Sequence, residues 1–256
     1  MMKFSLKNSK VIISLIFWVF FILVWNEYSG IMPVYQLPSP LLVSTAMMKI
    51  VVDLDLISQI GLSLFHITSA MFIAFCVGVF LSLLPIYNVH FEHFVDHRLT
   101  PFLNSFSGVG WLFIAILWFG INSFTVIFAV TMVLIPFAII NLRTGIAEMD
   151  SDILELGNSL TRNYKILLLN VKAPMLFPYA FATLRTSFGV SWKVVLTAEL
   201  FGGAGGMGYI LNKSRQEFET EMIFAVIAFI IIFVIIAEVL FFSPVQKHLD
   251  KRYIRD

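Results

Sequence analysis

A series of long apolar runs constrains this chain more than any other feature of the sequence. Six runs, separated by more polar intervals, cover about residues 11–25, 60–85, 102–119, 124–142, 178–200 and 222–242. Each approaches the roughly 20 residues that a helix needs to cross a hydrocarbon core about 30 Å thick. We therefore expect an all-α, polytopic membrane protein with about six transmembrane helices.

The composition supports a bilayer environment. Only 13% of the residues are charged, about half the average of roughly 25% in soluble domains. The one cysteine, Cys76, excludes a disulfide within the chain. The formal charge of +1 gives no indication of nucleic acid binding.

The first apolar run has two interpretations. Lys3, Lys7 and Lys10 precede it, as in a secretory signal peptide. However, no pair of small residues follows to mark a cleavage site, since Asn26-Glu27-Tyr28 comes next. We therefore expect an N-terminal transmembrane helix within residues 1–35, followed by a transmembrane domain over residues 36–256.

The distribution of Lys and Arg predicts the orientation in the membrane. With six helices, the two termini, the 88–98 interval and the 143–178 interval share one side, which holds 13 of the 17 basic residues when Arg185 is included. Lys49, Lys213 and Arg215 fall on the other side, and Lys193 lies within a run. This asymmetry places both termini and the 143–178 interval in the cytoplasm.

The interval 143–178 is the longest polar stretch between apolar runs, and it is where a membrane protein would meet an aqueous partner. Asp152 and Glu155 have the spacing of a capping box, so we expect Asp152 to cap a short helix. A solvated connection without a partner is the alternative interpretation.

Three other patterns do not support a reaction or a metal site. Residues 203–208 satisfy G-x-G-x-x-G, but they follow an apolar run rather than a strand, so we expect a tight loop instead of a nucleotide site. His90, His93 and His97 have helical spacing, which is more typical of a solvated helix face than of a metal site. The sequence also contains no P-loop and no nucleophile–base pair, so we expect no enzymatic activity in this chain.

Two segments of the polar interval resemble a known signature. Asp150-Ser-Asp-Ile-Leu-Glu155 and Pro174-Met-Leu-Phe-Pro178 resemble the signature of binding-protein-dependent ABC importer permeases, which reads E-A-A, three residues, Gly, nine residues and I-x-L-P. Aligned without a gap, Glu155 takes the Glu position and Pro174 the Pro position. Further likeness to the sulfonate, taurine and nitrate branch over about residues 36–256 comes from Leu37-Pro38-Ser39-Pro40-Leu41, Ala115-Ile-Leu-Trp-Phe-Gly120, Leu184-Arg185, Ser191-Trp192 and Ala198-Glu199.

The chain departs from that signature at two places. Leu156 and Gly157 stand where the family has Ala-Ala, and Thr161 stands where it has the turn glycine. A β-branched residue is poorly suited to positive φ. Gly157-Asn158-Ser159 offers turn-forming residues four positions earlier, so we expect the turn to be shifted.

The resemblance implies the permease subunit of an ATP-driven importer with a type I importer permease fold in a bacterial inner membrane. It implies a second permease copy, an external or periplasmic solute-binding protein, and a separate subunit that binds ATP, so this chain needs no cofactor of its own. The ATPase would dock on the 143–178 segment, through residues Asp152, Glu155, Gly157, Thr161 and Arg162. The alternative is a secondary transporter driven by an ion gradient, which would normally show internal repeats that are not evident here.

Lys193 is the candidate substrate-pathway residue, together with its neighbour Trp192. It lies about 22 Å along a helix from Pro178, towards the far leaflet, and a lipid-facing Lys at a helix centre is unfavourable by roughly 2.5–3.5 kcal/mol. Pairing with Glu199 is one alternative, although six residues place it about 120° away round the helix, and snorkelling is another. We expect Lys193 to attract an anionic substrate such as a sulfonate, taurine or nitrate, with Trp192 and Glu199 nearby.

Overall fold

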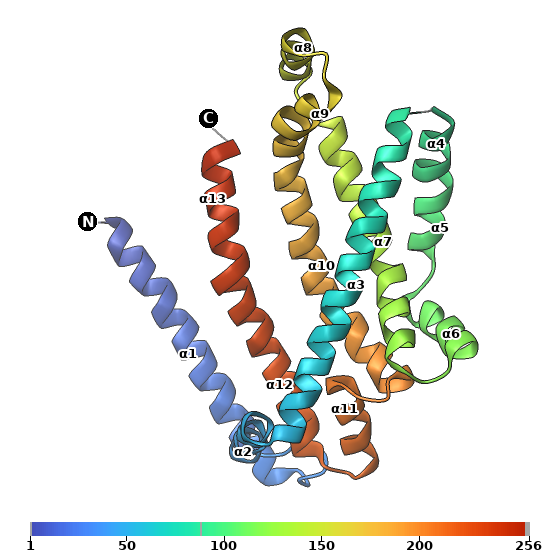
Figure 1. Cartoon of the computed structure of the whole chain (residues 1–256). Helices are drawn as coiled ribbons and strands as arrows, with labels where there is room; N and C mark the ends of the chain where they lie inside the picture. Colours follow the sequence, from blue (N-terminus) through green and yellow to red (C-terminus); the bar gives the residue numbers. More distant parts are fainter. Residues whose placement is uncertain (1, 88, 254–256) are drawn as a thin grey trace. The chain divides into compact units, whose positions relative to one another are not determined.

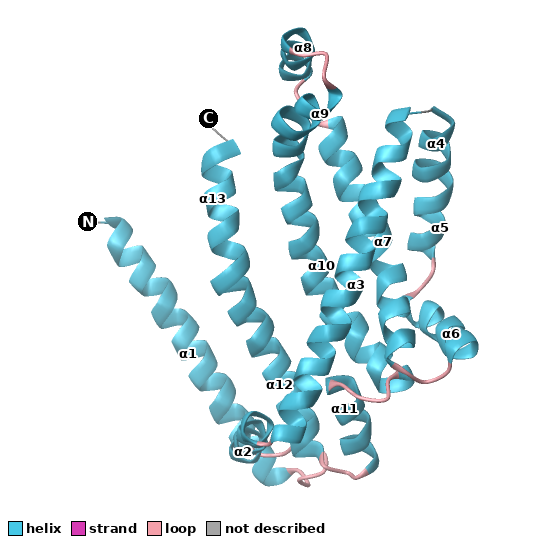
Figure 2. Cartoon of the chain, in the orientation of Figure 1, coloured by secondary structure: helices cyan, strands magenta, loops and turns pink. Residues whose placement is uncertain are grey.

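The apolar runs of the sequence fold into long helices. The computed structural model describes residues 2–87 and 89–253, and no strand occurs among them (Figures 1 and 2). The elements, with π-helical turns written η, are α1 (Met2–Ile31), α2 (Pro40–Val52), α3 (Leu54–Tyr87), α4 (Val89–Phe94), η1 (Val95–Leu99), α5 (Thr100–Ser105), α6 (Gly108–Phe119), α7 (Ser123–Ala147), α8 (Ser151–Leu160), α9 (Tyr164–Leu167), η2 (Leu168–Lys172), α10 (Ala173–Gly202), α11 (Met207–Gln216), α12 (Thr220–Ala237), η3 (Glu238–Phe242) and α13 (Ser243–Tyr253).

The described residues include four helices that are long and apolar enough to cross a membrane: Leu54–Pro85, Ser123–Ala147, Lys165–Gly202 and Thr220–Leu249. A fifth crossing results if the bent pair His90–Ser105 and Gly108–Phe119 counts as one span. The all-α, multi-span class is therefore confirmed, whereas the number six stays a prediction.

The third apolar run does not form the single helix that we expected over 102–119. Phe106 is extended, and the Ser107 hydroxyl accepts a hydrogen bond from the Val109 N–H, which starts α6 as a separate helix. The two parts of the run are bent by 81°. A serine N-cap inside the apolar run is the local cause of the break.

The chain divides into two compact units. Unit 1 contains residues 1–58 and 210–232, and unit 2 contains residues 59–209 and 233–256. In unit 1, the Trp25 indole N–H donates to the Pro38 carbonyl, and the Trp25 ring packs near Phe224.

The core of unit 2 is the pairing of α7 with α10, and twelve residues of α7 are buried (Figure 1). Small residues let α3 approach α7 closely, since a Cβ on Gly78 would lie 2.4 Å from the Ala138 Cβ. At one end of α10 lies α8, and at the other lies the 203–206 loop (Figure 1). These two ends and the face of α10 between them contain the sequence-predicted site residues.

Candidate functional site

The N-cap of α8 lies two residues before the position that the sequence predicted. The Asp150 side chain, not that of Asp152, accepts hydrogen bonds from the backbone N–H groups of Asp152 (2.9 Å) and Ile153 (3.4 Å). The capping prediction for Asp152 was therefore wrong. Asp152 lies in the first turn, where a carboxylate still interacts favourably with the helix dipole.

The turn after α8 lies at the position that the family signature gives it. The helix runs through Gly157-Asn158-Ser159 and ends at Leu160, so the predicted earlier turn is wrong. Thr161 has φ −149° and ψ 136°, which is extended backbone that a β-branched residue adopts readily. The departure from glycine at this position therefore creates no strain.

The predicted docking residues differ in their exposure. Asp152, Glu155 and Arg162 are exposed, and Thr161 is partly buried. Gly157 is buried, and a Cβ there would lie 2.8 Å from Leu167 Cδ1, so this glycine contacts its own chain.

Three apolar side chains of α8 are exposed on one side of the helix. Ile153 is 46% exposed, Leu156 59% and Leu160 77%. Spacings of three and four residues bring side chains to one helix face. The helix therefore presents an apolar stripe that its own chain leaves uncovered, a feature typical of contact surfaces.

One face of α10 lines a groove of about 590 Å³ that contains three charged side chains. Arg185 and Lys193 come from α10, and Glu238 comes from η3. The Arg185 guanidinium forms an ion pair with the Glu238 carboxylate, with 2.9 Å between Nε and Oε1. Lys193 is exposed, and it joins no ion pair within the described part of the chain.

The opposite face of α10 is buried in unit 2. Trp192 is 2% exposed, and its ring centroid lies 5.4 Å from that of Phe233. Glu199 is 1% exposed. Of the three predicted pathway residues, only Lys193 thus reaches the groove, and Trp192 and Glu199 point into the protein.

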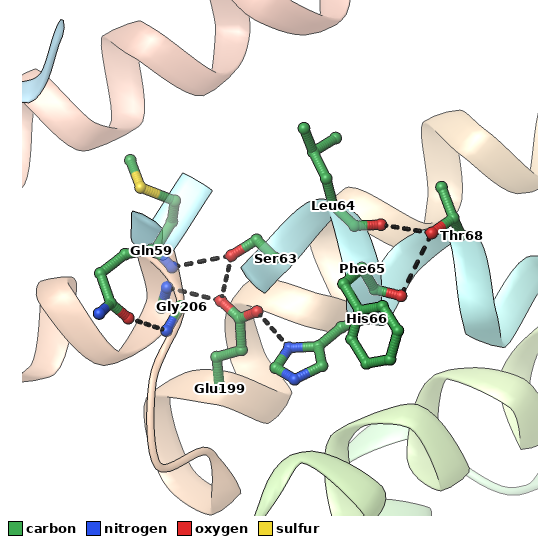
Figure 3. Close-up of polar contacts among 10 residues, drawn as sticks. Gln59, Ser63, Leu64, Phe65, His66, Thr68, Glu199 and Gly206 are labelled. Atoms are coloured by element: carbon green, nitrogen blue, oxygen red, sulfur yellow. Dashed lines mark hydrogen bonds and ion pairs between the residues drawn. The ribbon is translucent and has the colours of Figure 1, made fainter. Parts of the chain in front are cut away.

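Glu199 is the centre of a buried polar cluster (Figure 3). Its Oε2 accepts hydrogen bonds from the Ser63 hydroxyl at 2.8 Å and the Gly208 N–H at 2.9 Å. Its Oε1 lies 2.8 Å from Nδ1 of His66, which is fully buried. Three donors thus compensate one buried carboxylate, as burial of a charge requires.

The same cluster holds the loop that joins α10 to α11 (Figure 3). The Gly206 N–H donates to Gln59 Oε1 at 2.7 Å, and the Met207 N–H donates to Ser63 Oγ at 2.8 Å. Gly206 has φ +105°, and a Cβ on it would lie 2.2 Å from the Glu199 carboxyl carbon. The glycines therefore allow a tight loop to close over Glu199, as the sequence indicated, rather than a nucleotide site.

The partners of Glu199 were missed at the level of sequence because they lie far along the chain. The carboxylate partner of His66, for example, lies 133 residues further along the chain. The available signal was the spacing of Ser63 and His66, which puts two polar side chains on one face of an apolar helix.

A second charged cluster lies where α7 meets the 88–98 interval. Arg143 forms ion pairs with Asp96 and with Glu92 at 2.6 and 2.9 Å.

No group of three His, Cys, Asp or Glu within the described ranges 2–87 and 89–253 is arranged to hold a metal ion.

Comparison with known proteins identifies the family. The model of the family described as binding-protein-dependent transport system inner membrane component matches residues 9–255, nearly the whole chain. The chain belongs to this family. It is thus an inner-membrane, multi-pass transport subunit of ABC importers, as the signature around Glu155 indicated, and the family is a transport component rather than an enzyme.

Several relatives of this permease are named for small anions. A protein of Bacillus subtilis assigned as the aliphatic sulfonates transport permease SsuC is 22% identical over 80% of this chain and 74% of that protein. The nitrate import permease protein NrtB of Synechococcus elongatus is 26% identical over 80% of this chain and 78% of that protein. The bicarbonate transport system permease protein CmpB of the same species is 27% identical over 68% of this chain and 63% of that protein.

The fold of the permease also occurs among solved structures. A chain of the MetNI methionine ABC transporter, in an inward-facing conformation, superposes with a TM-score of 0.67. The alignment covers 76% of this chain and 95% of that chain at 14% sequence identity. This likeness confirms the importer permease fold.

Proposed function

We propose that this permease conducts a small solute with a negatively charged oxo group, such as a sulfonate, taurine or nitrate, along the groove on α10. The observation that carries the proposal is the set of charged side chains in that groove: Arg185, Lys193 and Glu238. All three belong to helices that are apolar enough to cross a membrane.

The physical argument starts from the unfavourable free energy of a charge in lipid. A charged side chain at the centre of a membrane helix typically faces a water-filled cavity or another protein group. Arg185 and Glu238 satisfy each other in part, while Lys193 adds an unpaired positive charge to the groove lining. An excess of positive charge raises the local concentration of anions.

The chemistry of the relatives supports the same substrate class. Sulfonate, nitrate and bicarbonate, named for SsuC, NrtB and CmpB, are all small oxoanions. A groove with two cationic side chains suits a ligand of this kind better than it suits a neutral solute.

We further propose that the ATPase subunit docks on α8. The exposed stripe of Ile153, Leu156 and Leu160 supports this role, with Asp152, Glu155 and Arg162 as polar contacts beside it. Since Gly157 and Thr161 are partly or fully buried, their role would be to position α8 rather than to contact the partner.

The family and the position of α8 support proposals for the remaining partners and for the orientation. Two copies of the permease would face each other as a homodimer, and a solute-binding protein would deliver the anion at the end that holds the 203–206 loop. Gln246 and Leu249 of α13 line a cavity together with Asp150 and Ile153, which supports a cytoplasmic location for α13 beside the docking helix. The charge asymmetry supports the same location for the N-terminus.

The test is uptake by the reconstituted importer with its ATPase and binding protein. Lys193→Met should lower uptake of ethanesulfonate or nitrate at least tenfold, while membrane insertion and ATPase association remain normal. Lys213→Met is the matched control, because Lys213 is also exposed but does not line the groove. Unchanged uptake by Lys193→Met would refute the assignment of the groove.

A further inference from the structure

We propose that Arg185 and Glu238 form an anion-exchange gate, in which the substrate anion competes with the Glu238 carboxylate for the Arg185 guanidinium. The inference rests on the proposed function, since it assumes that an anion enters the groove. It adds Arg185 to Lys193 as a second anion-binding site, and we call each of the two sites a station. It also gives a reason why the anion is released again.

The geometry of the ion pair suits reversible exchange. Both Nε and Nη2 of Arg185 donate to the same oxygen, Oε1 of Glu238. Each side chain is 36% exposed, so the pair lies on the wall of the groove and not in the core. An anion in the groove can therefore approach the guanidinium without unfolding any part of the helix.

The two cationic side chains are too far apart to hold one small anion together. Arg185 and Lys193 are eight residues apart on α10, which corresponds to a rise of about 12 Å. Gly189 lies midway between them and also lines the groove. A small oxoanion would thus contact Lys193 and Arg185 in succession, and the glycine leaves the space between them open.

The two stations differ in chemistry. An ammonium is a compact charge that attracts any anion, whereas a guanidinium presents a planar fork that matches two oxygens of an oxoanion. At Arg185 the fork formed by Nε and Nη2 is already occupied by Glu238, so an anion binds this fork only by replacing the carboxylate. The competition lowers the affinity of the station and lets the anion leave it.

The proposal predicts that removing the competitor strengthens anion binding. We would titrate ethanesulfonate into the purified permease–ATPase complex in nanodiscs, at low ionic strength and without the binding protein. Glu238→Gln should bind ethanesulfonate about fivefold more tightly than the wild type, the upper end of what an exposed ion pair contributes. It should also slow uptake, because the anion leaves Arg185 more slowly.

Two comparisons make the effect specific. Glu92→Gln is the matched control, since it removes a carboxylate from Arg143, which keeps Asp96 and lies outside the groove. It should leave the affinity unchanged. Nitrate should show the same gain as ethanesulfonate in Glu238→Gln. Chloride offers the fork one atom instead of two oxygens, so it should gain less, and an equal gain for chloride would refute the role of the fork.

The double variant Arg185→Gln/Glu238→Gln keeps the proposal testable if Glu238→Gln does not assemble. It removes the pair without leaving an unpaired charge, and it should bind ethanesulfonate more weakly than the wild type. Equal or tighter binding would exclude Arg185 as a station. An importer that takes up no oxoanion would refute the proposed function itself. If uptake depends on Lys193 but Glu238→Gln binds ethanesulfonate with unchanged affinity, only the gate is refuted.

Discussion

At one end of α10 a glutamate, a serine and a histidine are buried, and at the other end three apolar side chains of α8 are exposed. Ser63 and His66 both form hydrogen bonds with Glu199, and backbone N–H groups at the start of α11, directly after the loop that follows α10, donate to Ser63 and Glu199. In α8 the only buried residue is Gly157. One end thus satisfies its polar groups within the chain, whereas the other presents an apolar surface that its own chain leaves uncovered.

This difference shows that polarity alone does not identify a functional residue in a membrane protein. Glu199 is as charged as Glu155, yet its hydrogen-bond partners are all in its own chain. Substitutions in the Glu199 cluster should therefore change stability, and substitutions in α8 should change assembly.

The largest effect is expected from Glu199→Ala. It leaves the Ser63 hydroxyl, the His66 ring and the Gly208 N–H without their acceptor in a buried site. Removing one partner of a buried charge pair typically destabilises a protein by about 3–5 kcal/mol. We expect a large loss of folded protein in the membrane, measured as the yield of the monodisperse peak in detergent.

Glu238→Ala provides the contrast on stability, because Glu238 is partly exposed and has one partner. Its yield should stay close to that of the wild type. If both variants gave the same yield, the Glu199 cluster would not be the stronger structural element.

The second effect is expected from Gly206→Ala. The backbone there has φ +105°, which side chains rarely adopt, and the new methyl would overlap the Glu199 carboxylate. Thermal denaturation in detergent should show a loss of about 2–3 kcal/mol in stability. Gly30→Ala is the matched control, because no atom lies within 4 Å of a Cβ at that position, and a loss as large there would argue against a local effect.

The third prediction concerns assembly rather than stability. Leu156 is exposed on α8, so Leu156→Asp should leave the yield of the permease unchanged. If the stripe contacts the ATPase, burying a charge there should weaken co-purification by at least tenfold, as for a residue at the centre of an interface. Glu155→Arg should act in the same direction, and normal co-purification of both variants would remove α8 from the interface.

The long helices could be predicted from the sequence, because an apolar run of sufficient length has few alternatives in a membrane. The break at Ser107 was not predicted, because it depends on a local serine cap inside an apolar run. The cluster at Glu199 depends on contacts between residues more than 130 positions apart, which no local pattern contains. The exposed position of Lys193 and the buried position of Trp192 likewise follow from how α10 is rotated against its neighbours.

The smallest effect is expected from Thr161→Gly, which restores the glycine of the family signature. The family glycine suggested a turn with positive φ, and a threonine there would be strained. In this chain Thr161 is extended, so glycine relieves nothing and only adds freedom to the unfolded chain. The Thr161 hydroxyl also accepts a hydrogen bond from the Asn163 N–H at 3.1 Å, which glycine would lose. We therefore expect a small loss of stability, about 0.5–1 kcal/mol, and uptake within twofold of the wild type. A clear gain in stability would show that the backbone at Thr161 is not extended.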